Sequence, residues 1–150
     1  MIRALILILI PCLLFSQDVP VGQWKDYLAY NKTTDVAIAQ ERIYCVAQGG
    51  LFYYDKNDNS INRISKINGL SDKGVKKIKY NNYNNSLIII YENCNVDILK
   101  NDQIFNISDI KRKEITGTKE INNIYFDQNL TYLSCSFGVV VLDLMKNETK

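Results

Sequence analysis

The chain has 150 residues, of which 47% are hydrophobic and 23% are charged, and its formal net charge is +2. This composition is typical of one folded domain rather than a disordered chain, and a charge so close to neutrality argues against a nucleic-acid-binding protein. The chain contains no histidine, the commonest general base and metal ligand, so the composition also disfavours an enzyme.

Residues 1–16 are predicted to form a secretory signal peptide. Arg3 supplies a positive charge near the start, and an uninterrupted apolar run over 4–10 follows it. We expect cleavage after Ser16, which would make Gln17 the first residue of an exported chain with no transmembrane segment. The apolar run is short for a helix that crosses a bilayer, so a retained membrane anchor is the less favoured alternative.

Cys12 raises a second alternative for this segment, a lipoprotein acylated at that cysteine. Pro11 precedes it, where a small residue such as alanine or glycine is usual. Acylation at Cys12 is therefore disfavoured.

The exported chain opens with an aromatic segment over 21–30. Trp24, Tyr27 and Tyr30 are spaced by three residues, which is compatible with a helix, but the mixture of a glycine with several aromatic side chains favours an extended segment. Large aromatic side chains mostly serve cores, so we expect these to pack against a neighbouring blade rather than to form a platform on which a ligand stacks.

One strand-like pattern occurs three times. It begins at Gly50 with Gly-Leu-Phe-Tyr-Tyr-Asp, returns at Asn95 with Asn-Val-Asp-Ile-Leu-Lys, and returns again at Gly138 with Gly-Val-Val-Val-Leu-Asp. The starting residues lie 45 and 43 residues apart. A strand-rich unit that repeats every ~40–45 residues is typical of β-propeller blades with four strands each. The sequence therefore predicts an all-β fold, a partial β-propeller of about three four-stranded blades.

Apolar runs separated by Asn, Asp and Gly locate the strands, and runs that are apolar on both faces indicate blades covered on both sides. The first blade is expected near 34–65, with strands at 36–39, 42–47, 51–55 and, less clearly, 60–64. The second is expected near 75–108, with strands at 75–80, 86–91, 96–100 and 103–107. The third is expected near 121–150, with strands at 121–126, 131–136 and 139–144 and an outer strand still forming at 147–150.

Two connections separate the blades. The first, over 66–74, carries an Asn-Gly pair and a second glycine and is expected to be a turn-rich loop. The second, over 109–120, interrupts the strand pattern. Here Ser108 is expected to cap a short helix over 109–114, with Asp109 in its first turn.

Three blades do not close a ring, because propellers need ~4–8 blades to hide their sheet edges. We therefore expect residues 17–150 to be the N-terminal part of a larger propeller.

Three cysteines remain after the signal peptide, one in each blade: Cys45, Cys94 and Cys135. They form no Cys-x-x-Cys pair, so a zinc or redox site is unsupported, and their placement in different blades predicts free thiols. Cys45 and Cys135 alternate with apolar residues and are expected to be small members of the core.

The sequence carries no catalytic constellation and no metal-binding motif, and nothing in it calls for a cofactor. Asp72, Asp97, Asp109 and Asp143 are scattered and do not form a calcium-binding loop. The remaining candidates for a site are two basic runs. Such runs are usually solvated surface, and the alternative is a patch that binds an anionic polysaccharide or phosphate. The candidates are Lys76, Lys77 and Lys79 in a run that starts at Lys73, and Lys111, Arg112 and Lys113 in the second run.

The loop Asn68-Gly-Leu-Ser71, followed by an apolar strand, resembles the repeats of two-component-regulator propellers. Four stretches taken in order more closely resemble a related family, the PorZ-like N-terminal β-propellers of the Bacteroidetes type IX secretion system. The resemblance covers nearly all of residues 22–150. The stretches are Gly22-Gln-Trp24, Lys66-Ile-Asn-Gly-Leu-Ser-Asp72, Asn106-Ile-Ser-Asp-Ile-Lys-Arg-Lys113 and Tyr132-Leu-Ser-Cys-Ser-Phe-Gly138.

This resemblance implies two propeller domains and a C-terminal sorting domain in the whole protein, without a catalytic motif. It also implies a place at the cell surface in the outer-membrane attachment complex, with a sortase as partner and anionic lipopolysaccharide as a ligand. The first hypothesis is therefore a non-enzymatic binding and scaffold role in type IX secretion. The alternative is the periplasmic, glycan-sensing propeller of a hybrid two-component regulator, and the shared fold does not separate the two.

Overall fold

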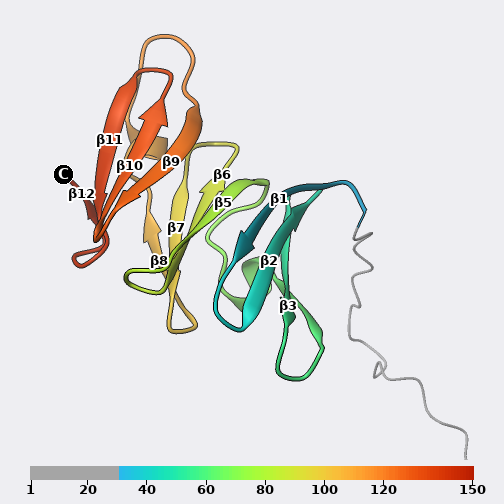
Figure 1. Cartoon of the computed structure of the whole chain (residues 1–150). Helices are drawn as coiled ribbons and strands as arrows, with labels where there is room; N and C mark the ends of the chain where they lie inside the picture. The colour runs from blue at the N-terminus through green and yellow to red at the C-terminus, as the bar shows by residue number, and fades with distance from the viewer. Residues whose placement is uncertain (1–30) are drawn as a thin grey trace, which may run out of the picture.

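The computed structural model of the chain describes residues 31–150 (Figure 1). The signal peptide with its cleavage after Ser16, the lipoprotein alternative at Cys12 and the aromatic segment over 21–30 lie outside the described residues. The described part forms three four-stranded antiparallel sheets, and in each of them consecutive strands pair.

The three sheets follow one another along the chain and stand side by side, as consecutive propeller blades do (Figure 1). The first contains β1 (Thr33–Ile38), β2 (Arg42–Ala47), β3 (Gly50–Asp55) and β4 (Ile61–Ile64). The second contains β5 (Val75–Asn81), β6 (Ser86–Tyr91), β7 (Val96–Lys100) and β8 (Gln103–Ile107). The third contains β9 (Ile121–Asp127), β10 (Leu130–Cys135), β11 (Gly138–Asp143) and β12 (Glu148–Thr149).

The all-β fold with three four-stranded blades is confirmed, and each predicted strand is present within a few residues of its expected position. β2, β6, β7 and β8 have the predicted bounds. β1 begins earlier than expected, because the polar residues from Thr33 to Asp35 pair with β2 through a bulge that a hydrophobic pattern does not reveal.

Several of the polar turns contain residues with a left-handed backbone. Asn59, Asn85, Asn101 and Asp102 have φ angles between 50° and 58°. Asn and Asp tolerate this conformation because their short side chains hydrogen-bond to nearby backbone groups. Chain reversal therefore accounts for the Asn-rich and Asp-rich composition of these turns before any role in binding is considered.

The helix expected between the second and third sheets is shorter than predicted, and its predicted cap is wrong. α1 spans Asp109–Arg112, and Ser108 makes no side-chain hydrogen bond to it. The backbone of Ser108 has φ −97° and ψ 7°, not the extended conformation that lets a capping side chain reach the first turn. Lys113 is extended and ends the helix, and the Lys119 ammonium donates to three carbonyls of this segment, at 2.8, 2.9 and 3.4 Å.

A 3-10 helix, η1 (Lys66–Asn68), begins the connection between the first and second sheets. The Ser65 hydroxyl accepts the backbone N–H of Ile67, and the Asn68 side chain accepts the backbone N–H of Ser65. This reciprocal cap gives a fixed shape to the start of a segment that the sequence marked only as a loop.

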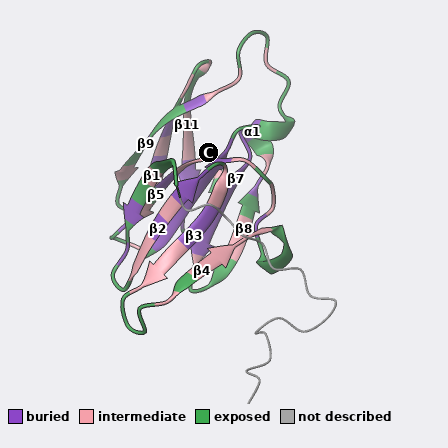
Figure 2. Cartoon of the chain, turned by 90° about the vertical axis from the view of Figure 1, so that its right-hand side faces the viewer, coloured by how far each residue is buried: buried purple, intermediate pink, exposed green. Residues whose placement is uncertain are grey.

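Two hydrophobic cores lie between the sheets, and the second sheet contributes to both (Figure 2). All six residues of β6 are buried. Leu87 and Ile89 belong to the core shared with the first sheet, whereas Ile88 and Ile90 belong to the core shared with the third. A strand buried on both faces has a continuous apolar sequence, which explains why β6 was predictable.

The outer faces of the first and third sheets carry exposed apolar side chains. Val36 and Ile38 on the first sheet are 51% and 66% exposed, and Tyr125 and Val139 on the third are 67% and 66% exposed. These faces therefore differ from the two internal ones, which are closed by a neighbouring sheet.

The three cysteines of the described part are free, as predicted, but only Cys94 is buried. Cys45 pairs with Val36 across the first sheet and lies on its open face, so it is half-buried. Cys135 packs at the rim of the second core opposite Gly138, which has no side chain to cover it. The expectation that both are core residues is corrected accordingly. Partial burial raises the pKa of both thiols.

Candidate functional site

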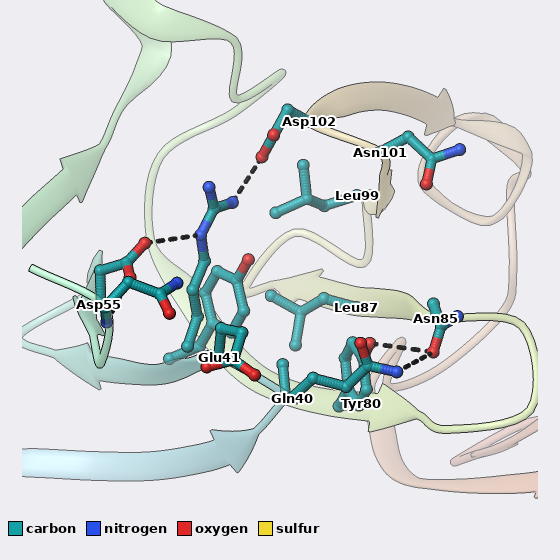
Figure 3. Close-up of a pocket in the computed structure, with 13 residues that line it drawn as sticks. Gln40, Glu41, Asp55, Tyr80, Asn85, Leu87, Leu99, Asn101 and Asp102 are labelled. Atoms are coloured by element: carbon teal, nitrogen blue, oxygen red, sulfur yellow. Dashed lines mark hydrogen bonds and ion pairs between the residues drawn. The ribbon is translucent and has the colours of Figure 1, made fainter.

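A polar cleft lies between the first and second sheets, at the end where the turns β1–β2, β3–β4, β5–β6 and β7–β8 gather (Figure 3). Its cavity volume is about 350 Å³, within the range of small-molecule sites. Leu87 and Leu99 lie between its two polar ends in Figure 3. The lining residues are Ala39, Gln40, Glu41, Arg42, Tyr44, Asp55, Asn57, Tyr80, Asn85, Leu87, Leu99, Asn101 and Asp102.

Arg42, the first residue of β2, joins the two sheets at one end of this cleft. Its Nε lies 3.3 Å from Asp55 of its own sheet, and its Nη1 lies 2.5 Å from Asp102 in the β7–β8 turn of the second sheet. The guanidinium also lies 4.7 Å from the centre of the Tyr53 ring. The hydrogen bond to Asp102 and the neighbouring Tyr44 raise the pKa of Arg42, so it stays cationic and both carboxylates are engaged by it.

Carboxamide and phenol groups form the other end of the cleft. The Gln40 side chain donates to Asn85 Oδ1 at 3.2 Å, and the Tyr80 hydroxyl donates to the same oxygen at 3.3 Å. Lys56 donates to the Gln40 carbonyl at 2.6 Å. These bonds hold turns of two sheets together, so the polar groups of the cleft are fixed before any ligand arrives.

Two phenols and two carboxylates of the cleft are hydrogen-bonding groups. Burial raises the pKa values of Tyr44 and Tyr80, so both phenols stay neutral near pH 7. Asp55 and Asp102 are both bonded to a guanidinium. Among residues 31–150, no group of three or more Cys, Asp or Glu side chains is placed to hold a metal ion.

Three lysines of the first predicted basic run, Lys76, Lys77 and Lys79, lie on β5, the inner strand of the second sheet, whereas Lys73 lies in the loop before it. Lys76 pairs with Glu120, just before β9, and two β9 carbonyls accept from the others, Asn122 from Lys77 at 2.8 Å and Ile124 from Lys79 at 2.6 Å. The Lys79 ammonium also lies 5.7 Å from the centre of the Phe126 ring. These lysines therefore join the second sheet to the third.

The second basic run lies on α1 and just after it. Lys111 pairs with Asp72 at 2.6 Å, Arg112 pairs with Asp109 at 2.8 Å, and Lys113 is exposed. The bonds from Lys111 and Asn93 hold the pKa of the Asp72 carboxyl well below its usual range. The side chains of the two basic runs therefore contact different residues of the chain.

A buried carboxylate, which the sequence analysis considered only as a possible calcium ligand, fixes the connection between the first two sheets. Asp97 has no exposed surface, and its carboxylate accepts hydrogen bonds from the Tyr91 hydroxyl at 2.5 Å, the Ser71 backbone at 2.9 Å and the Asn106 side chain at 2.7 Å. Burial and the bond to Asp97 raise the pKa of Tyr91. This buried hydrogen-bond network stabilises the connection between the first two sheets.

The sequence analysis did not predict the residues of the cleft as a site. Gln40 and Asn85 sit 45 residues apart, which equals the first repeat spacing, and that coincidence is a signal that could have paired the two turns. Arg42 and Asp102 are 60 residues apart, outside the repeat, and no pattern in the sequence joins them.

Comparisons with known proteins give a consistent family assignment. The sequence profile of the PorZ N-terminal β-propeller domain, a component of type IX secretion, matches residues 43–150. The solved structure of PorZ from Porphyromonas gingivalis, an essential bacterial surface component of the type-IX secretion system, is 30% identical with a TM-score of 0.78. That match covers 85% of this chain and 17% of PorZ, so the chain spans about a sixth of that protein's length.

Two further solved structures share the fold at low identity. AztD from Citrobacter koseri is 12% identical with a TM-score of 0.59, and the match covers 79% of this chain and 32% of AztD. The extracellular domain of BT4673 from B. thetaiotaomicron is 11% identical with a TM-score of 0.62, and the match covers 79% of this chain and 16% of that one. No curated protein sequence matches the chain significantly.

Proposed function

The chain belongs to the family of PorZ N-terminal β-propeller domains, and from this membership we propose that it is a non-enzymatic binding and scaffold module of the type IX secretion system at the bacterial surface. The observation that carries the proposal is the likeness to PorZ, 30% identical over 85% of this chain with a TM-score of 0.78.

The chemistry of the described residues supports a binding role. In the polar cleft the carboxylates of Asp55 and Asp102 are engaged by Arg42, and Asn85 is held by Gln40 and Tyr80. Such groups recognise a ligand by hydrogen bonds and contribute no activated nucleophile. A platform of fixed polar turns on rigid sheets is how propellers present binding surfaces.

The proposed setting is the outer-membrane attachment complex of a Bacteroidetes cell. The chain would be exported with loss of residues 1–16 and displayed at the cell surface, where its partners would be a sortase and the other proteins of that complex. Anionic lipopolysaccharide would be its ligand, with Lys113 and the neighbouring basic residues of α1 as candidates for that contact. Within residues 31–150, no helix is long and apolar enough to cross a membrane.

Affinity purification from the native cell tests the proposal. The full-length gene product would carry an epitope tag, be solubilised from the outer membrane with mild detergent and be recovered with its partners for mass spectrometry. We expect the sortase and further type IX components in the recovered sample and not with an unrelated tagged surface protein. Recovery of a histidine kinase in place of type IX components would overturn the proposal in favour of the sensory alternative.

A further inference from the structure

A second groove lies at the opposite end of the first sheet from the polar cleft. Three segments line it: the β2–β3 turn with the start of β3 (48–51), the end of β4 with η1 (63–67), and the later part of the connection to the second sheet (70–74). Its cavity volume is about 530 Å³.

The groove has an apolar lining with one prominent exposed side chain. Leu51 and Leu70 are buried beneath it, and Ile64 is partly buried. Ile67, on η1, is 98% exposed. Covering a large aliphatic side chain that stands in water beside an apolar groove is favourable, because it removes apolar surface from water.

Ile67 is held in this position by hydrogen bonds. The caps of Ser65 and Asn68 fix η1, the Asn68 side chain donates to the Arg63 carbonyl at 2.7 Å, and the Leu70 backbone donates to the Ser65 carbonyl at 3.0 Å. Its exposure is therefore a property of a structured turn.

The opposite wall of the groove is equally fixed. The Val75 backbone donates to the Gly49 carbonyl at 2.9 Å, and a Cβ added to Gly49 would meet the Gly74 Cα at 3.2 Å. Gly49 has φ +74°, which also favours glycine. A partner would thus meet a preformed groove and would not have to order it.

Four charged residues line the groove: Arg63, Lys66, Asp72 and Lys73. Lys66 and Lys73 are exposed, and within residues 31–150 neither forms an ion pair. The acidic residue of the lining, Asp72, is already bonded to Lys111 and Asn93, both at 2.6 Å. The groove therefore pairs an apolar lining with two unmatched cations.

We propose that this groove docks an extended peptide segment of a partner protein in which apolar side chains are flanked by carboxylates. Lys66 and Lys73 come from two different walls, so they match acidic groups on both sides of an apolar side chain. An anionic lipid is less well matched, because its charge lies at one end of its apolar part. The inference rests on the geometry of the groove and does not require the secretion role.

Fluorescence anisotropy with a defined peptide tests the proposal. The probe is a fluorescein-labelled, amidated peptide of sequence Glu-Ile-Glu-Val-Asp-Leu, and its counterpart carries Lys at every acidic position. We expect saturable binding of the acidic probe to the chain, at least tenfold weaker binding to the Lys66→Glu/Lys73→Glu variant, and no binding of the basic counterpart. Ile67→Ala should also weaken binding severalfold without unfolding the chain, because the side chain is exposed.

The matched controls lie away from the groove. Lys146→Glu, in the β11–β12 turn, changes charge in the same sense, and Val139→Ala truncates another exposed apolar side chain. Both should bind the acidic probe as the unaltered chain does. No binding of the probe at millimolar protein, or equal losses in the control and groove variants, would overturn the proposal. So would failure of the probe to bind while phosphatidylglycerol vesicles bind through Lys66 and Lys73.

Discussion

Two aspartates stabilise the connection between the first and second sheets, one of them buried and the other partly exposed. Asp97 is fully buried and accepts three hydrogen bonds, one of them from the backbone of Ser71. Asp72 lies nearer the surface and pairs with Lys111 of α1. The hydrogen bonds of Asp97 are shielded from solvent, whereas the ion pair of Asp72 depends on the charge of a partly exposed carboxylate.

Replacement of Asp97 by Asn should destabilise the chain. The Asn amide would place a donor against groups that already donate, and an unsatisfied buried polar group costs about 1–3 kcal/mol. Urea unfolding followed by circular dichroism measures the change in the free energy of unfolding. Asp127→Asn, at an exposed position, is the control and should stay within about 0.5 kcal/mol. Equal stabilities of the two variants would show that the Asp97 network contributes nothing.

The contribution of Asp72 should depend on pH. Its pKa in the folded chain is lowered, first by Lys111 and then by Asn93, so its stabilising effect is present above the unfolded pKa of about 3.9 and is lost as pH falls through the folded value. The stability difference between the unaltered chain and Asp72→Asn should be constant from about pH 5 to 8 and shrink below about pH 4. The stability difference between the unaltered chain and Lys111→Met should shrink over the same pH range. A stability difference that persists at low pH would contradict a stabilising role for the charge of Asp72.

The strand is the scale at which the sequence was most informative. β6 and β7 were located by their apolar runs, because a strand covered on both faces has no polar side to interrupt the pattern. β1 was placed less well because its first residues are polar and bulged, and the cap of α1 failed because it depends on the backbone angles of Ser108. Patterns of side chains do not encode such local backbone geometry.

Truncation of an isoleucine should lower the free energy of unfolding more on an inner sheet face than on an open one. Ile89 in β6 has no exposed surface, so Ile89→Ala should lower the free energy of unfolding by about 2–5 kcal/mol. Ile38 in β1 is 66% exposed, and Ile38→Ala should cost less than about 1 kcal/mol. Denaturant unfolding of both variants checks this, and similar costs at the two sites would argue against the assigned packing of the sheets.

At the scale of the whole molecule, the repeat spacing reappears in the bonds between sheets. The Asp35 side chain accepts the Ile78 backbone N–H from 43 residues away, and Lys77 and Lys79 bond to β9 carbonyls 45 residues away. The inner edge of each following sheet is thus bonded by side chains of the preceding one, which protects strand edges that would otherwise pair with other chains. The repeat predicted the order of the sheets, while the lysines that join them appeared in the sequence only as a basic run.

The cleft and the groove were beyond the reach of the sequence for a related reason. Each is assembled from turns of separate strands, and a turn rich in Asn and Asp is explained by chain reversal alone. Arg42 and Asp102 meet only because the first two sheets pack face to face. Family likeness, in contrast, is carried by stretches spread along the chain and was accessible from the sequence.

A role in type IX secretion is tested most directly by the secretion of type IX cargo in cells that lack the gene. Cargo would be followed by immunoblotting of periplasmic, surface and culture fractions, in the native bacterium, in a deletion strain and in strains re-expressing the full-length gene with or without Ile89→Asp. We expect cargo to accumulate in the periplasm of the deletion strain and the unaltered gene to restore its delivery to the surface. Ile89→Asp should not restore delivery, because it places a charge in the core between the first two sheets. Normal delivery of cargo in the deletion strain would contradict a role in type IX secretion.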